Sequence, residues 1–189
     1  MKKKMLFNGF DNKTLGILGG GQLGRMIGQS ASRLGIKVII MDPNKKSPAF
    51  QVANRSIVAS FENKEKLRKF AKSCDVVTYE FENIPLNSLQ YIAKFTKIYP
   101  GINPLKISQD RLLEKKFIKN LNIKVANFYP INNKQDLITN LSYLKGRGLL
   151  KTRKLGYDGK GQTYIQLNKQ KNLQIPRIKK NDYIIEELI

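Results

Sequence analysis

A basic, glycine-rich segment late in the sequence has the composition of a phosphate-binding loop. Lys151 closes an apolar run, Lys160 follows within the same segment, and glycines stand at positions 156, 159 and 161. Glycine turns expose backbone N–H groups and lysine ammonium groups act as point charges, so this segment can fold over a triphosphate. It lacks the Gly-Lys-Ser/Thr ending of a Walker A loop. The alternative interpretation is a basic surface hairpin.

A second glycine pattern, Gly19-x-Gly21-x-x-Gly24, lies between an expected strand and an expected helix. Such a turn directs backbone N–H groups at the start of a helix, where phosphate binds well. Asp42 ends the next strand, where the ribose-binding acid of a dinucleotide fold would stand. The pattern by itself leaves three interpretations open: binding of NAD or FAD, binding of another phosphorylated ligand, and a purely structural turn.

Two acidic segments also follow apolar strands. Glu80 and Glu82 come at the carboxyl end of one strand, which is the edge where open α/β sheets place ligands. Because these two acids alternate along an extended segment, we expect only one of them to face the ligand. Glu186 and Glu187 end the last apolar run of the sequence. Solvated acids at a strand end and a plain edge strand are the alternatives.

Composition excludes several kinds of chemistry. The 189 residues are 41% hydrophobic, they include no histidine, and Cys74 is their one cysteine. Histidine-based triads, histidine metal ligands, intramolecular disulfides and thiolate metal clusters are therefore excluded, and we expect a buried, inert thiol. No apolar run is long enough to span a bilayer, and no apolar segment follows the basic N-terminus as in a signal peptide. We expect a cytoplasmic protein without a membrane segment.

The formal net charge of +21 raises the question of nucleic-acid binding. The lysines are spread over the whole length, and no block combines aromatic with basic residues as a base-stacking platform would. Abundant Lys, Asn and Ile are typical of drift in an AT-rich genome. We therefore do not expect a nucleic-acid partner.

The elements that must position these residues alternate between strand and helix. Helical spacing of apolar residues, ended by Gly35, follows the first glycine turn, and Pro85 is typical of a helix start. Such alternation predicts an α/β fold whose parallel sheet is covered on both faces. The expected strands are 14–18, 37–41, 75–79 and 97–99, and the expected helices are 23–34, 62–73 and 85–94.

The pattern changes near residue 104. Ser108 is a good N-cap and Asp110 suits the first turn of a helix that runs to about Leu121. The remaining expected elements are strands at 125–128, 148–152, 162–166 and 183–187 and a helix at 133–144.

Three motifs together resemble the N5-carboxyaminoimidazole ribonucleotide synthase family of the ATP-grasp superfamily. They are Gly-Gly-Gly-Gln-Leu-Gly-Arg-Met at 19–26, Tyr-Glu-Phe-Glu-Asn-Ile at 79–84 and Gly-Tyr-Asp-Gly-Lys-Gly-Gln at 156–162. The resemblance covers residues 14–189, and its second and third motifs are specific whereas the glycine turn is not. It implies a parallel-sheet, Rossmann-like pre-ATP-grasp domain that binds substrate at 1–106. The first part of an ATP-grasp domain would follow at 107–189, with a small lid subdomain at 125–189.

The resemblance also implies a reaction and its residues. ATP would phosphorylate bicarbonate, and the amine of aminoimidazole ribonucleotide would take up the carboxyl group. Lys151 and Lys160 would act in catalysis, while Gln22, Leu23 and Glu80 would line the ribonucleotide site. This assigns the first glycine turn to the phosphoribosyl substrate, and Asp42 then no longer argues for NAD. The implied ATP-binding residues are Arg111, Lys151, Gly156, Tyr157, Asp158, Gly159, Lys160, Gly161, Gln162, Glu186, Glu187, Leu188 and Ile189.

Members of that family are about twice as long as this chain and are expected to be homodimers. The resemblance implies that acidic Mg²⁺ ligands belong to the missing C-terminal half, so we assign no metal ligand here and expect no turnover by this chain alone. One alternative is a non-catalytic nucleotide- or nucleic-acid-binding remnant. Another is a relative of formate-dependent glycinamide ribonucleotide transformylase, which typically has Glu where Gln22 stands. An NAD oxidoreductase is the third.

Overall fold

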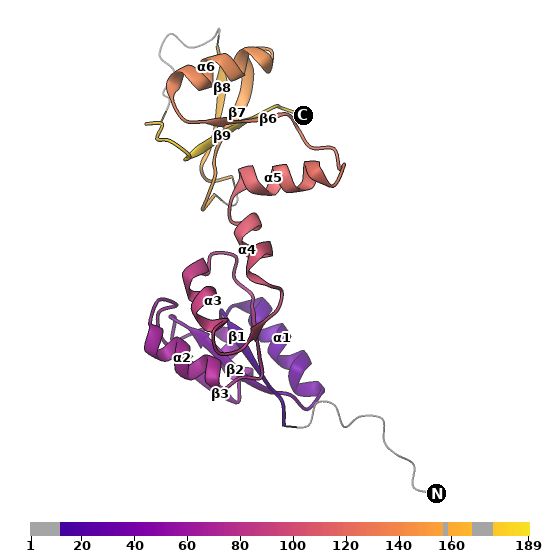
Figure 1. The fold of residues 1–189 in the computed structure, drawn as a ribbon, viewed down its shortest axis with the longest axis vertical. Coiled ribbons are helices and arrows are strands. Elements are labelled where there is room, and N and C mark those ends of the chain that lie inside the picture. The colour runs from indigo at the N-terminus through magenta and orange to yellow at the C-terminus, as the bar shows by residue number, and fades with distance from the viewer. Residues whose placement is uncertain (1–11, 157–158, 168–175) are drawn as a thin grey trace, which may run out of the picture. The chain divides into compact units, whose positions relative to one another are not determined.

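The computed structural model describes residues 12–156, 159–167 and 176–189. The chain forms two compact units, Met1–Leu105 and Lys106–Ile189, each built around its own sheet (Figure 1).

The first sheet has five parallel strands in the order β3-β2-β1-β4-β5, which confirms the predicted parallel α/β arrangement. Its central strands are nearly continuous apolar runs, as expected of a parallel sheet buried on both faces. The strands are β1 (Thr14–Leu18), β2 (Lys37–Asp42), β3 (Arg55–Val58), β4 (Val76–Tyr79) and β5 (Lys97–Ile98).

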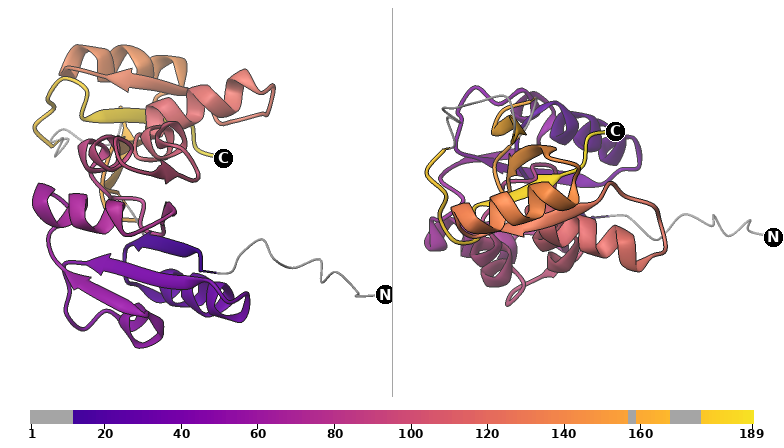
Figure 2. Two further views of the ribbon diagram at one scale, coloured as in Figure 1. Left: turned by 60° about the horizontal axis from the view of Figure 1, so that its bottom comes forward. Right: turned by 90° about the horizontal axis from the view of Figure 1, so that it is seen from above.

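Helices cover both faces of this sheet (Figure 2, left). On one face, α1 packs Ala31 against Ile17, Val38 and Ile40. On the other face, α2 and α3 bury a larger cluster in which Phe70 is fully enclosed. The helical elements are α1 (Gln22–Arg33), the 3₁₀-helix η1 (Pro48–Val52), α2 (Lys64–Lys72), α3 (Leu86–Ile92) and α4 (Ile102–Ser108), whose last residues belong to the second unit.

The strand register brings the polar residues of the first unit to one edge. Leu18 is paired with Met41 of β2 on one side and with Tyr79 of β4 on the other. The chain segments that follow these three positions therefore leave the sheet side by side. They are the glycine turn, Asp42 and Glu80, which sequence patterns had singled out.

The second sheet is antiparallel, with the order β6-β9-β7-β8. Its strands are β6 (Phe128–Ile131), β7 (Arg147–Thr152), β8 (Gln162–Gln166) and β9 (Tyr183–Glu186). Two helices, α5 (Arg111–Asn120) and α6 (Lys134–Tyr143), lie on opposite sides of it (Figure 1).

Alternation along β7 and β9 gives this sheet two different faces. Leu150 and Ile185 point toward α6 and form its core with Ile131, Leu137, Leu141, Leu144 and Ile165. The residues next to them along the two strands, which include Lys151 and Glu186, belong to the opposite face of the sheet, which we call the α5 face.

Three predictions about elements were wrong or incomplete. Strand β3 was missed because it is an edge strand with mostly exposed residues and so has no apolar signature. The strand predicted at 125–128 begins three residues later, as β6 at Phe128–Ile131. It contains Pro130, and this proline is tolerated because β6 is an edge strand. The N-cap of α5 is Asp110 and not Ser108, since the Asp110 carboxylate accepts hydrogen bonds from the N–H groups of Leu112 and Leu113. Sequence patterns also missed η1 and α4.

Candidate functional site

A cluster of charged side chains lies on the α5 face of the second sheet. The Lys151 ammonium contacts Glu186 Oε2 at 2.7 Å, and the Lys115 ammonium from α5 contacts the same oxygen at 3.4 Å. The Glu186 side chain is only 6% exposed, and the lysines are 20% and 18% exposed. The strand register explains the meeting, because Lys151 and Glu186 stand on adjacent strands and on the same face.

The second carboxylate oxygen of Glu186 is not satisfied. Oε1 is fully buried and has no hydrogen-bond partner within the described residues. Leaving a charged acceptor buried without a donor is costly, and such groups often mark places where a ligand completes the site. The chemistry that fits Oε1 is an N–H or O–H donor.

Arg111 anchors the glycine-rich segment to the start of α5. Its Nη1 donates to the carbonyl of Thr152 at 2.7 Å, and its Nη2 donates to the carbonyl of Gly156. Its backbone N–H donates to the carbonyl of Arg153 at 2.9 Å. A guanidinium carries five N–H donors, so Arg111 can hold these carbonyls and still donate to a phosphate.

Two glycines of the segment have no room for a side chain. A Cβ at Gly156 would lie 2.5 Å from Arg111 Nη1 and 2.8 Å from Thr152 Oγ1. A Cβ at Gly161, whose φ is +71°, would lie 2.5 Å from Thr152 Oγ1. The backbone at these positions therefore closes directly onto Thr152 and Arg111, which explains why the loop contains glycine there.

A buried ion pair between Arg153 and Asp110 holds the start of the glycine-rich segment against the start of α5. Arg153 binds the Asp110 carboxylate through both Nε, at 3.0 Å, and Nη2, at 2.6 Å. Burial raises the pKa of Asp110, but the hydrogen bonds and charge of Arg153, helped by the N–H groups of Leu112 and Leu113, outweigh this effect and hold it below its ordinary value. The pair joins the start of α5 to the end of β7, and so holds Arg111 and Lys151 near each other.

The structure describes most of the other residues expected to bind ATP. Gln162 pairs directly with Lys151 across β7 and β8, and Gly159 and Lys160 are exposed. The Glu187 carboxylate accepts a hydrogen bond from the Asn127 side chain at 2.7 Å. Leu188 and Ile189 are exposed, while Tyr157 and Asp158 lie outside the described residues.

The glycine turn of the first unit is held by two carboxylates. The N–H of Gly20 donates to Asp42 Oδ2 at 2.8 Å, and the N–H of Gly21 donates to Glu80 Oε1 at 2.9 Å. Asp42 also accepts from the N–H of Asn44 through its other oxygen. Both oxygens of Asp42 are thus engaged by the backbone, which accounts for this acid without a dinucleotide ribose.

The residues expected to line the ribonucleotide site meet at the start of α1. Gln22 and Leu23 form its exposed first turn, and Leu23 is 58% exposed. A mostly apolar hollow of about 650 Å³ begins beside Leu23 and Glu80 and continues along α1 past Met26 and Leu34. Glu80 thus both holds the glycine turn and lines an open hollow.

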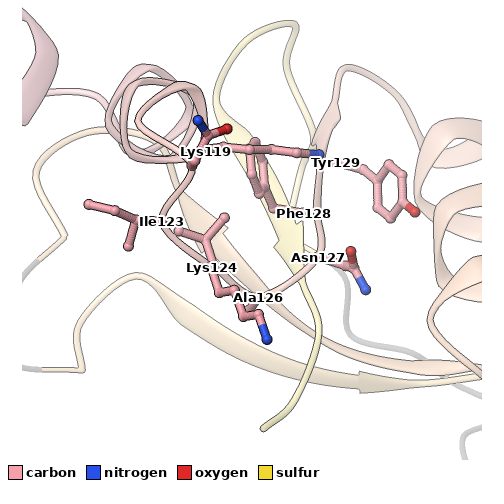
Figure 3. A pocket seen from close by; sticks show the side chains of 9 residues that line it. Lys119, Ile123, Lys124, Ala126, Asn127, Phe128 and Tyr129 are labelled. Carbon is pink, nitrogen blue, oxygen red and sulfur yellow. The ribbon is translucent and has the colours of Figure 1, made fainter.

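A second pocket, of about 410 Å³, was not suggested by any sequence pattern. It is lined by the end of α5, the connection from α5 to β6 and the start of β6, with Lys119, Lys124 and Phe128 among the lining side chains (Figure 3). It adjoins the 186–189 segment, because Asn127 accepts a hydrogen bond from the N–H of Glu187 and donates one to its carboxylate. Its lining residues are Lys119, Asn122, Ile123, Lys124, Val125, Ala126, Asn127, Phe128 and Tyr129.

Other site chemistry is limited within the part of the chain that the structure describes. There, no three His, Cys, Asp or Glu side chains are grouped closely enough to hold a metal ion. Cys74 is buried and donates to the Phe70 carbonyl, and burial raises the pKa of its thiol to about 12. No helix in the same residues combines the length and apolarity needed to cross a membrane.

Comparison with known proteins gives two family matches in chain order. Residues 12–109 match the ribonucleotide synthetase preATP-grasp domain family, and residues 116–189 match the ATP-grasp domain family.

Two similar proteins from different organisms carry the same name. The N5-carboxyaminoimidazole ribonucleotide synthase of Brucella melitensis biotype 1 is 46% identical over 152 residues, which are 80% of this chain and 42% of that protein. The synthase of the same name from Staphylococcus epidermidis is 37% identical over 176 residues, or 93% of this chain and 47% of that protein. The chain thus spans about half the length of the curated relatives it matches.

Solved structures agree with these matches. N5-carboxyaminoimidazole synthetase from Staphylococcus aureus, complexed with ADP, superposes with a TM-score of 0.84 at 33% identity over 99% of this chain and 50% of that one. The synthase from Aspergillus clavatus, in complex with ADP and 5-aminoimidazole ribonucleotide, gives a TM-score of 0.74 at 26% identity over 94% of this chain and 47% of that one. The chain therefore belongs to the N5-carboxyaminoimidazole ribonucleotide synthase family, of whose members it spans about half, with a pre-ATP-grasp domain and the first part of an ATP-grasp domain.

Proposed function

We propose that this chain provides the ribonucleotide-binding and part of the ATP-binding machinery of an N5-carboxyaminoimidazole ribonucleotide synthase. In the proposed reaction, ATP phosphorylates bicarbonate to carboxyphosphate, and the amine of aminoimidazole ribonucleotide takes up the carboxyl group. ADP and inorganic phosphate are the other products. The family resemblance also underlies our proposals that the enzyme works in the cytoplasm and as a homodimer.

The observation that carries the proposal is the α5 face of the second sheet. It combines Lys151, a buried oxygen of Glu186 that has no donor within the described residues, and a glycine-rich loop anchored by Arg111. A nucleotide matches these features, since its phosphates suit the cations and its exocyclic amine can donate to Glu186 Oε1. ADP in the relatives' structures supports this choice of ligand.

Catalysis in such a site rests on positioning and on charge neutralisation. We propose that Lys151, on a rigid strand, and Arg111, at the start of α5, neutralise developing charge on the transferred phosphoryl group. The loop from Gly156 to Gln162 would exclude water from the transferred phosphoryl group, and Lys160 would add a further cation. A bound Mg²⁺ would neutralise the β- and γ-phosphates; within the described residues, no three His, Cys, Asp or Glu side chains are grouped to hold it.

The ribonucleotide would bind at the first glycine turn. We propose that Glu80 contacts the substrate with its second oxygen, because Oε1 already holds the N–H of Gly21. Gln22 and Leu23, exposed at the start of α1, would complete that site. The 5-aminoimidazole ribonucleotide in the Aspergillus clavatus complex supports this class of substrate.

Direct binding measurements test the nucleotide part of the proposal. Calorimetric titration of the chain with ATP, ADP, NAD and a DNA duplex, at two salt concentrations, compares the candidate ligands. We expect saturable binding of ATP and ADP and no binding of NAD, and any binding of DNA through the net positive charge should collapse as salt rises. Lys151→Met should weaken ATP binding about tenfold, roughly 1.4 kcal/mol.

The matched control is Lys154→Met, which removes the same charge from an exposed position of the same loop. Its ATP affinity should stay close to that of the wild-type chain. Equal losses in the two variants, or tighter binding of NAD than of ATP, would contradict the proposal.

A further inference from the structure

Lys115 is the residue of the α5 face that neither the motifs nor the family resemblance singled out. It stands four positions after Arg111, so helical geometry places both side chains on the same side of α5. That side faces the sheet, since Arg111 donates to Thr152 and Lys115 contacts Glu186. α5 therefore brings two cations to one face.

Two contacts fix the position of the Lys115 ammonium. It lies 3.4 Å from Glu186 Oε2 and 5.7 Å from the ring centroid of Phe128. Phe128 and Glu186 are direct partners across β6 and β9, so both contacts come from one point of the sheet. With its side chain only 18% exposed, Lys115 is a built part of this face and not a solvated surface lysine.

The charge balance explains what this position accomplishes. Lys151 and Lys115 share one carboxylate, so the cluster has two positive charges and one negative charge. If Lys151 were the only partner of Glu186, the pair would be neutral and would attract polyphosphate weakly. With Lys115 beside it, Glu186 is compensated while the cluster keeps a net positive charge.

We propose that Lys115 is a positioning residue for nucleotide binding: it shares the charge of Glu186 and so leaves the Lys151 ammonium available to the phosphates. This inference rests on the proposed function and adds to it a residue that acts through Lys151.

The first test compares Lys115→Met with Lys116→Met, an adjacent exposed lysine of the same helix. We expect Lys115→Met to weaken ATP binding about tenfold and Lys116→Met to change it by less than about twofold. Lys115→Arg should restore most of the affinity, because a guanidinium keeps the charge and also stacks on aromatic rings. Equal affinities of the Met variants, or no rescue by arginine, would overturn the inference.

A second measurement needs no nucleotide. Acetic anhydride modifies Lys151 at a rate that mass spectrometry can follow at fixed pH. This rate reports how tightly the Glu186 carboxylate holds the Lys151 ammonium. We expect acetylation of Lys151 to slow about threefold in Lys115→Met and to stay unchanged in Lys116→Met. An unchanged rate in Lys115→Met would refute the role of Lys115 even if ATP binds. If the wild-type chain binds no ATP but the rate falls as expected, the proposed function fails while the charge sharing stands.

Discussion

At the scale of single residues, the site depends on side chains that meet backbone at very short range. Arg111 donates to two carbonyls of the glycine-rich segment, and Gly156 is one of them. Because a Cβ at Gly156 would lie 2.5 Å from Arg111 Nη1, this residue determines whether the guanidinium can occupy its place. The identity of Gly156 is thus explained by a contact with a residue 45 positions away.

We predict that Gly156→Ala displaces Arg111 and lowers ATP affinity about tenfold, since a charge-assisted contact is lost. Calorimetric titration measures the effect. Gly101→Ala is the control, because a Cβ at Gly101 meets nothing within 4 Å. Wild-type affinity in Gly156→Ala would mean that Arg111 does not depend on this approach.

Glu186 shows how much one buried residue can link. Its Oε2 forms ion pairs with Lys151 and Lys115, and its Oε1 has no hydrogen-bond donor within the described residues. The sequence pattern singled out this residue, but as one of two acids at a strand end. Its neighbour Glu187 has a different environment, because its carboxylate binds the Asn127 side chain.

At the scale of elements, α5 is held at its first turn by a capping residue that is also an ion-pair partner. Asp110 caps the helix through Leu112 and Leu113 and binds Arg153 with both carboxylate oxygens. The Asp110 side chain is 6% exposed, so removing its charge leaves a buried guanidinium without compensation. The pair therefore stabilises both the start of the helix and the end of β7.

We predict that Asp110→Asn lowers the free energy of unfolding by about 3 kcal/mol. Glu65→Gln breaks an exposed pair with Lys69 and should cost less than about 0.5 kcal/mol. Urea denaturation of both variants measures the difference. Similar losses in the two variants would show that Asp110 and Arg153 act as an ordinary surface pair.

The same pair gives stability a defined pH dependence. The folded-state pKa of Asp110 lies below its ordinary value, so the stabilisation is complete above the unfolded-state pKa of about 4. It is lost as the pH falls through the lower folded-state pKa. Asp110→Asn should therefore be less stable than wild type at pH 7, and the gap should narrow below pH 4 in the same urea measurement.

At the scale of the whole molecule, the described residues form three hydrophobic clusters, and each cluster belongs to one unit. The clusters around Phe70 and around Ile17 consist of residues of the first unit, and the cluster around Leu137 consists of residues of the second. Phe70 and Leu137 are both fully buried. Each unit thus has the core that independent folding requires.

We predict two unfolding transitions that respond to different substitutions. Phe70→Ala should lower the free energy of unfolding of the first unit, and Leu137→Ala should lower that of the second unit, each by about 3–4 kcal/mol. Calorimetry combined with hydrogen exchange would assign each transition to a unit. If either substitution shifts both transitions equally, the two units unfold as one.

The family itself could be inferred from the sequence, because its motifs are contiguous. Short segments such as 79–84 and 156–162 carry their chemistry in local spacing, and strand–helix alternation predicts a parallel sheet through local periodicity. The same locality explains the errors. An exposed edge strand such as β3 has no apolar period, and the N-cap Asp110 also binds Arg153, which is remote in sequence.

Tertiary structure alone decided which residues share a face and what each carboxylate does. Asp42 and Glu80 are far apart in sequence, yet parallel register brings both to the glycine turn, where they accept backbone hydrogen bonds. Lys115 lies outside every motif and joins Lys151 and Glu186 only because α5 packs on that side of the second sheet. Sequence determines local geometry and composition, but the burial and charge balance of a site arise from contacts between distant segments, and no local pattern encodes them.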